Sequence, residues 1–197
     1  MTVETQSETR AGRLYVISAP SGGGKTSLTR AVIERLGASG RVARFSVSYT
    51  TRDARAGEVD GVDYHFVSRD EFEAMAERGE FLEYARVFDR YYGTSAAETA
   101  RWLDAGQDVV LDIDWQGAAQ VRERAPQAIT IFIRPPSREE LERRLRARAS
   151  EDEDAIARRL AEADDELAHA GDYDYQIVND RFEHALDELT DIFERTA

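Results

Sequence analysis

A short apolar segment that runs directly into a glycine-rich turn constrains the fold of this chain more than any other feature. Residues 14–18 (Leu-Tyr-Val-Ile-Ser) have the length of one buried strand, and Ala-Pro-Ser-Gly-Gly-Gly follows at 19–24. A helical pattern begins at Lys25, with apolar residues at helical spacing as far as Leu36. Because Gly37 comes next, the sequence predicts that the helix ends there. A strand, a glycine loop and a helix in this order are typical of a phosphate-binding loop.

The residue types of this loop suit a nucleotide. The pattern G-x-x-x-x-G-K-[ST] is met except at Ala19, which replaces its first glycine. Loop N–H groups and the helix N-terminus would surround a phosphate, Lys25 would reach the β- and γ-phosphates, and the Thr26 hydroxyl would bind Mg²⁺. The alternative is a surface turn that happens to contain lysine. We disfavour it because both flanking elements are present and Lys25 is the only lysine in the chain.

Composition excludes several classes of protein. A net charge of -13 argues against nucleic acid or an anionic membrane as partner, since either needs a basic face. The absence of cysteine excludes disulfides and thiolate zinc sites. No apolar run approaches the roughly 20 residues of a membrane span. Residues 1–10 are polar, which predicts a disordered tail and not a signal peptide, and we expect a cytoplasmic protein.

Strand and helix patterns alternate along the rest of the chain, which predicts an α/β fold with a parallel sheet. Strands are expected at 41–48, 64–67, 81–87, 109–114, 128–133 and 173–178, with a turn at 91–94. Helices are expected to start at Ser68, Ser95, Ser137, Ser150 and Asp180. We predict one domain over 11–197, in which 48–94 form a small lobe inserted into the core.

Several motifs, in order along the chain, resemble the guanylate kinase family, whose members phosphorylate GMP with ATP. They are residues 18–26, 46–58 with Gly61, Tyr64 and Phe66, then 81–85, 91–94, 111–114, 133–137 and 177–180. The resemblance extends from about Arg13 to Phe193. It implies a P-loop NTPase-type parallel sheet flanked by helices, with a core at 11–47, 95–143 and 161–197, a GMP-binding lobe at 48–94 and a lid at 144–160. It also implies the reaction ATP + GMP → ADP + GDP with Mg²⁺, in guanine nucleotide metabolism, with dGMP as a further acceptor.

A pair of arginines is the candidate site for the phosphate of GMP. Arg52 and Arg55 lie three residues apart in a polar loop, and two guanidinium groups suit a terminal monophosphate. The alternative is solvated surface charge. The resemblance assigns the phosphate to these two arginines with Tyr64 and Tyr92, and adds Glu58 to the GMP-binding residues.

An acidic residue inside an apolar strand is the candidate reader of guanine. Glu83 lies within 81–87, where an unpaired carboxylate would be costly unless it faces water at the edge of a sheet. The resemblance assigns the base to Glu83, Ser48, Thr94 and Asp114. Asp112 and Asp114 are two apart on a predicted strand and should share one face. We assign Asp112 to the metal, together with Thr26, and also count Asp112 among the GMP-binding residues. We assign Asp114 to the guanine base.

The remaining predicted residues belong to ATP and to catalysis. By resemblance, ATP is bound by Ser21, Gly22, Gly23, Gly24, Lys25, Thr26, Ser27 and Asn179. Lys25, Arg52, Arg144, Arg148 and Arg159 supply positive charge for catalysis, and the last three belong to the lid. Ala149 stands where family members often have glycine. For the arginines the alternative is again a solvated helix face.

Two other functions compete with this interpretation. A non-catalytic scaffold module of the same resemblance would have a degraded phosphate loop, whereas the loop is intact here. A P-loop kinase acting on a phosphorylated sugar would lack guanine readers such as Glu83 and Ser48. We therefore favour the kinase of GMP.

Overall fold

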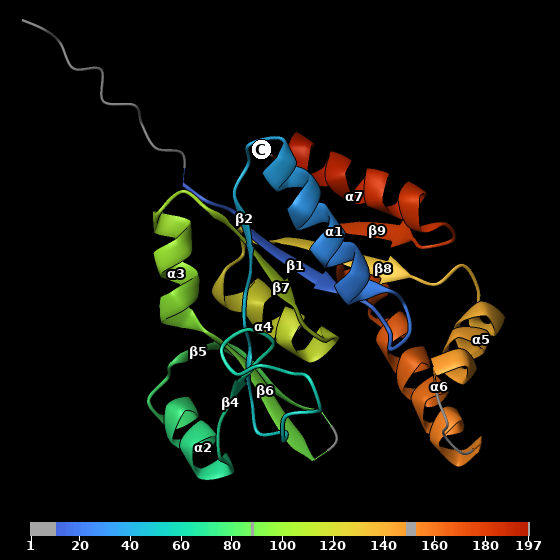
Figure 1. Cartoon of the computed structure of the whole chain (residues 1–197), viewed down its shortest axis with the longest axis horizontal. Coiled ribbons are helices and arrows are strands. Elements are labelled where there is room, and N and C mark those ends of the chain that lie inside the picture. The colour runs from blue at the N-terminus through green and yellow to red at the C-terminus, as the bar shows by residue number, and fades with distance from the viewer. Residues whose placement is uncertain (1–10, 88, 149–152, 197) are drawn as a thin grey trace, which may run out of the picture.

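Five parallel strands form the central sheet, in the order β2-β7-β1-β8-β9 (Figure 1). The computed structural model describes residues 11–87, 89–148 and 153–196, without the side chain of Arg148. The strands are β1 (Leu14–Ser18), β2 (Ala43–Phe45), β7 (Asp108–Asp112), β8 (Ile129–Arg134) and β9 (Tyr175–Val178). The predicted α/β fold with a parallel sheet is therefore confirmed.

Helices cover both faces of this sheet, because its strands are apolar on both sides. Tyr15 and Ile17 face a core cluster built with α1 (Lys25–Ala38) and α7 (Phe182–Arg195). Leu14 and Val16 face a second cluster, built with α4 (Trp115–Arg124) and packed against α3 (Ala96–Asp104). Side chains alternate across a strand, so a continuous apolar run of this kind must be covered twice.

A second sheet, in the order β4-β3-β6-β5, lies to one side of the carboxyl ends of the central strands (Figure 1). It comprises β3 (Tyr49–Thr50), β4 (His65–Phe66), β5 (Phe81–Val87) and β6 (Arg90–Ser95), with α2 (Arg69–Glu77) packed on it. The predicted turn at 91–94 is wrong, since these residues pair with β5. A Cβ on Gly93 would lie 3.0 Å from ring atoms of Phe72 and Phe81, so these rings would have to shift to admit a larger residue.

On the other side, α5 (Arg138–Arg148) and α6 (Glu153–Ala168) pack together through a small apolar cluster that includes Leu141, Leu145 and Leu160. A short 3-10 helix, η1 (Ala170–Asp172), leads from α6 to β9. The predicted helix start at Ser150 lies outside the described residues.

Several predicted boundaries need correction. Helix α1 continues through Gly37 to Ala38, and the glycine with left-handed geometry is Gly40, with φ of 85°. The strand expected at 41–48 is paired only over Ala43–Phe45, the last strand begins at Tyr175, and the last helix begins at Phe182. Asp114 is not on a strand: it is the N-cap of α4, whose Gly117 N–H its side chain accepts at 2.9 Å. Helix α4 itself is not predicted by the sequence patterns.

Arg41 joins three elements of the core through one guanidinium group. Its Nε donates to Asp108 Oδ2 at 2.6 Å, Nη2 donates to the Tyr15 hydroxyl at 2.9 Å, and Nη1 donates to the Phe193 carbonyl. Both charged side chains are largely buried, with 16% and 4% exposure for Arg41 and Asp108. Removing one member of such a pair leaves a buried charge without its counter-ion.

We expect Arg41→Met to lower the free energy of unfolding by about 3 kcal/mol, because a buried ion pair is broken on one side. Arg35→Met is the matched control, since Arg35 pairs with Asp187 on an exposed surface, and its loss should stay below about 1 kcal/mol. Urea denaturation of the wild type and of the two variants measures both losses of unfolding free energy. Equal losses in the two variants would contradict the structural role of Arg41.

Candidate functional site

A cavity of about 390 Å³ lies where the loop after β1 meets the second sheet. This is the carboxyl edge of the central strands, where ligands of open parallel sheets bind. The predicted site residues that line it are Ser21, Gly22, Gly24, Lys25, Thr26, Ser27, Ser48, Tyr64, Glu83, Tyr92, Asp112 and Asp114. The fold thus brings residues from both sheets to one opening.

Glycine geometry shapes the phosphate-binding loop. Gly22 and Gly24 have φ of 86° and 93°, in the left-handed region that other residues rarely adopt. Asn179, the residue directly after β9, supports the loop by donating from Nδ2 to the Gly23 carbonyl at 2.8 Å. A Cβ on Gly24 would lie 2.4 Å from that nitrogen. The loop backbone is therefore held open at the N-terminus of α1, where an anion is favoured.

Lys25, Thr26 and Asp112 form a compact polar group at the base of the cavity. Lys25 Nζ lies 2.6 Å from Asp112 Oδ1 and donates to the Ile113 carbonyl at 3.1 Å. The Thr26 hydroxyl donates to the other oxygen of Asp112 at 2.8 Å. Burial lowers the pKa of Lys25, but Asp112, together with Glu166 and Asp114, raises it overall. Lys25 is therefore positively charged at the mouth of the loop.

Glu83 lies on β5 and is only 3% exposed. The water-facing alternative for this residue is therefore wrong. Its Oε1 accepts a hydrogen bond of 2.5 Å from the Thr94 hydroxyl of the neighbouring strand β6. Burial raises the pKa of Glu83 to about 7, against the hydrogen bond from Thr94, and the Asp114 carboxylate adds to the rise. The side chain is thus a carboxyl group that titrates near neutral pH at the wall of the cavity.

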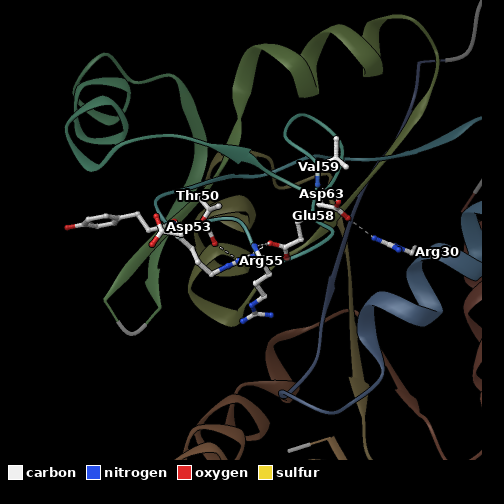
Figure 2. A network of polar contacts seen from close by, with 9 residues as sticks. Arg30, Thr50, Asp53, Arg55, Glu58, Val59 and Asp63 are labelled. Atoms are coloured by element: carbon white, nitrogen blue, oxygen red, sulfur yellow. Dashed lines mark hydrogen bonds and ion pairs between the residues drawn. The ribbon is translucent and has the colours of Figure 1, made fainter.

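Residues 51–64 connect β3 to β4 and carry Arg52 and Arg55, and we call this segment the arginine loop. Glu58 holds this loop together through its hydrogen bonds (Figure 2). Its two oxygens accept from Arg52 Nη1 and Nη2 at 2.9 and 2.8 Å, and Oε2 also accepts from the Arg55 N–H at 2.7 Å. These contacts lower the pKa of Glu58 to about 2, with the Arg52 hydrogen bonds as the largest cause and the Arg55 N–H next. In Figure 2 the Arg55 guanidinium points away from this carboxylate. Asp63, further along the loop, accepts from the Val59 N–H and pairs with Arg30 of α1.

The other predicted residues whose side chains the structure describes are not among those that line the cavity. Arg52 stacks over the rings of Tyr64 and Phe66, at 5.3 and 5.7 Å from their centroids. Arg144 donates from Nη2 to the Asn179 carbonyl at 3.0 Å and from Nε to Glu140. Arg159 lies on α6, and the side chain of Arg148 is outside the described part of the structure.

Glu166 is a cavity residue that the sequence analysis missed. From α6, its Oε2 accepts from the Ser21 N–H of the phosphate loop at 3.2 Å. Burial raises its pKa to about 7, against the attraction of Lys25. The available signal was weak: Glu166 adjoins the apolar stripe of α6, three residues after the buried Ala163.

A glycine loop with Lys25 and Thr26, at the carboxyl edge of a five-stranded parallel sheet, defines a P-loop nucleotide-binding protein. A family model described as guanylate kinase matches residues 11–196. The chain belongs to the guanylate kinase family. It is an enzyme that transfers a phosphoryl group from ATP to GMP, giving ADP and GDP.

Individual proteins agree with this assignment. The guanylate kinase of Chromohalobacter salexigens is 55% identical over 179 residues, covering 91% of this chain and 81% of that protein. That of Alkalilimnicola ehrlichii is 53% identical over 182 residues, covering 92% and 88%. The crystal structure of guanylate kinase from Anaplasma phagocytophilum superposes with a TM-score of 0.76 at 36% identity, covering 94% of this chain and 86% of that one. The resemblance seen in the sequence is confirmed, and the scaffold and sugar-kinase alternatives are set aside.

None of the helices in the described ranges combines the length and apolarity needed to cross a membrane.

Replacing Glu83 with Gln should stabilise the nucleotide-free protein in a pH-dependent way. The folded carboxyl group titrates at about 7 and the unfolded one at 4.5, so the folded state loses stability as pH rises between these values. Gln carries no such penalty and keeps an acceptor for Thr94. The variant should gain on the order of 3 kcal/mol over the wild type at pH 8, and much less at pH 5. Urea denaturation at the two pH values measures the gain, and a difference independent of pH would contradict it.

Proposed function

We propose that the cavity binds both substrates, with ATP held by the phosphate loop and GMP by the second sheet. The observation that carries this proposal is that Lys25, at the start of α1, and Glu83, on β5 of the second sheet, line one cavity. The Lys25 cation suits the phosphates of ATP, the phosphoryl donor. The Glu83 carboxyl group suits the guanine base of GMP, the phosphoryl acceptor. The lobe at 48–94 and the lid at 144–160 would bring the two together over the core segments 11–47, 95–143 and 161–197.

On the ATP side, the N–H groups of residues 21–27 surround the phosphates and Lys25 neutralises their charge. Asn179 supports this loop from below through Gly23. The Thr26 hydroxyl and the Asp112 carboxylate fit Mg²⁺, because both offer oxygen atoms and lie beside each other. When bound, Mg²⁺ neutralises charge on the β- and γ-phosphates. Within the described residues, no group of three or more Asp, Glu or His side chains could hold a metal ion.

On the GMP side, the acceptor phosphate is bound by Arg52 and Arg55 with the hydroxyls of Tyr64 and Tyr92. Guanidinium groups suit this role because they bind phosphate oxygens in pairs. Both oxygens of Glu58 are already engaged by the arginine loop. We therefore infer that Glu58 acts on GMP through Arg52, as a positioning residue.

Guanine presents a ring N–H and an exocyclic amine, which are donors, beside a carbonyl acceptor. Glu83 in its ionised form accepts from the two donors, while Ser48, Thr94 and Asp114 complete the base site. Thr94 orients the carboxylate through its hydroxyl. AMP would place a ring nitrogen lone pair against the same carboxylate, and such a mismatch is strongly rejected.

Phosphoryl transfer to GMP needs no general base, because the acceptor phosphate is already an anion. The protein's contribution is positioning and positive charge. Lys25 and Arg52 supply this charge from the two sides of the cavity, and Arg144, Arg148 and Arg159 supply it from the lid. We further propose a cytoplasmic location and dGMP as a second acceptor.

The test of guanine recognition compares GMP, dGMP, AMP and UMP as acceptors in a coupled ADP-release assay. The wild type should phosphorylate GMP and dGMP and show little activity with AMP and UMP. Glu83→Gln should lower kcat/KM for GMP by roughly ten- to a hundredfold, because a charge-assisted hydrogen bond to the base is lost. KM for ATP should change little. Full retention of the preference for GMP over AMP would contradict the assignment of Glu83.

Glu58→Gln tests the arginine loop. Gln cannot pair with Arg52 through two charged oxygens, so kcat/KM for GMP should fall about tenfold while KM for ATP is unchanged. Asp63→Asn is the matched control: it lies in the same loop and contacts Val59 and Arg30, and it should leave GMP kinetics near the wild type. Equal effects of Glu58→Gln on both substrates would show a general structural role instead.

A further inference from the structure

One face of helix α4 runs along the outer edge of β5, the strand that carries Glu83. Among the described residues, β5 is the end strand of the second sheet and pairs with β6 alone. Its other edge would otherwise present unpaired backbone groups. Helix α4 packs on the central sheet, so this contact joins the two sheets beside the base site.

Gln120 of α4 takes the place of a neighbouring strand. Its Oε1 accepts from the Tyr84 N–H at 3.2 Å, and its Nε2 donates to the Tyr84 carbonyl at 2.7 Å. One turn further on, Arg124 Nη1 donates to the carbonyls of Phe81 and Leu82 at 3.1 and 2.8 Å. These contacts hold the backbone on both sides of Glu83.

Gly117 of the same helix face determines how far the Glu83 side chain extends. A Cβ at Gly117 would lie 2.4 Å from Glu83 Oε2 and 3.1 Å from its Cδ. The other oxygen, Oε1, is held by Thr94. The carboxyl group is thus confined between the hydroxyl on β6 and the bare backbone of α4, and only glycine permits this approach.

We propose that Gly117 and Gln120 are positioning residues that determine base specificity, because α4 sets the place of the Glu83 carboxylate in the cavity. The proposal rests on guanine recognition by Glu83. Neither residue needs to touch the nucleotide. A displacement of the carboxylate by about 1 Å is enough to lose a hydrogen bond to the base, while the ATP side is unaffected.

Gly117→Ala is the direct test, since alanine favours a helix and the added methyl group must displace the carboxylate. We expect kcat/KM for GMP to fall at least about tenfold, with a smaller preference for GMP over AMP and KM for ATP within about twofold. Gln120→Met keeps the length of the side chain but removes both hydrogen bonds, and should show a loss of roughly three- to tenfold in the same direction. Glu123→Gln, on an exposed position of the same helix, should change neither quantity.

A second measurement separates positioning from a general loss of structure. In Gln120→Met, hydrogen exchange at the Tyr84 amide should accelerate, while the amides that pair β5 with β6 stay protected. Retained GMP preference in folded Gly117→Ala and Gln120→Met would overturn the proposal. Loss of protection throughout the sheet, or equal effects on GMP and ATP, would overturn it as well. If Glu83→Gln itself keeps the preference, guanine recognition by Glu83 fails, which is a distinguishable result.

Discussion

The parallel pairing of β1 with β7 is the constraint on which the site depends. In this register Ile17 lies beside Asp112, so both strands end at the same edge of the sheet. The glycine loop leaves β1 at that edge, and its Lys25 meets the Asp112 carboxylate at 2.6 Å. A shift of one residue would turn Asp112 to the opposite face and remove this contact. The place of the loop beside Asp112 therefore depends on this register of the sheet.

An acidic protein that binds two polyanions must reduce the negative charge of its own carboxylates near the bound nucleotides. The structure does this in two ways. Glu58 and Asp112 are paired with cations, Arg52 and Lys25, so their charge is balanced locally. Glu83 is instead buried and Glu166 half-buried, and this desolvation raises the pKa of each to about 7, so a proton can remove the charge at little cost.

Burial of the Glu83 carboxylate lowers the stability of the folded protein. A glutamine at this position would fit the same hydrogen bond from Thr94 without the desolvation cost of a carboxylate. Under the proposed function, the carboxylate instead accepts two donors from a base. Its surroundings belong to two sheets, since Thr94 lies on β6 and Gly117 lies on α4. The placement of this carboxyl group therefore depends on how the second sheet is attached to the core.

The sequence by itself determined those features that arise from local patterns. The glycine loop before Lys25, the capping serines Ser68 and Ser95, and the bounds of β5 all agree with the structure, because each depends on residues within a few positions. The parallel sheet was predictable for the same reason, from apolar runs that alternate with helices. The family resemblance then pointed to most of the residues that line the cavity.

Only the tertiary structure decided which distant residues meet. Residues 91–94 have the sequence of a turn, but in the structure they pair with β5. Helix α4 has too few apolar residues to be recognised from the sequence, because its polar face contacts the edge of β5. The contact of Glu58 with Arg52 and that of Glu166 with Ser21 are decided by side-chain geometry. The physical reason is that a hydrogen bond or an ion pair depends on the distance between two atoms in space. Spacing along the sequence determines that distance only for residues within one helix, strand or turn.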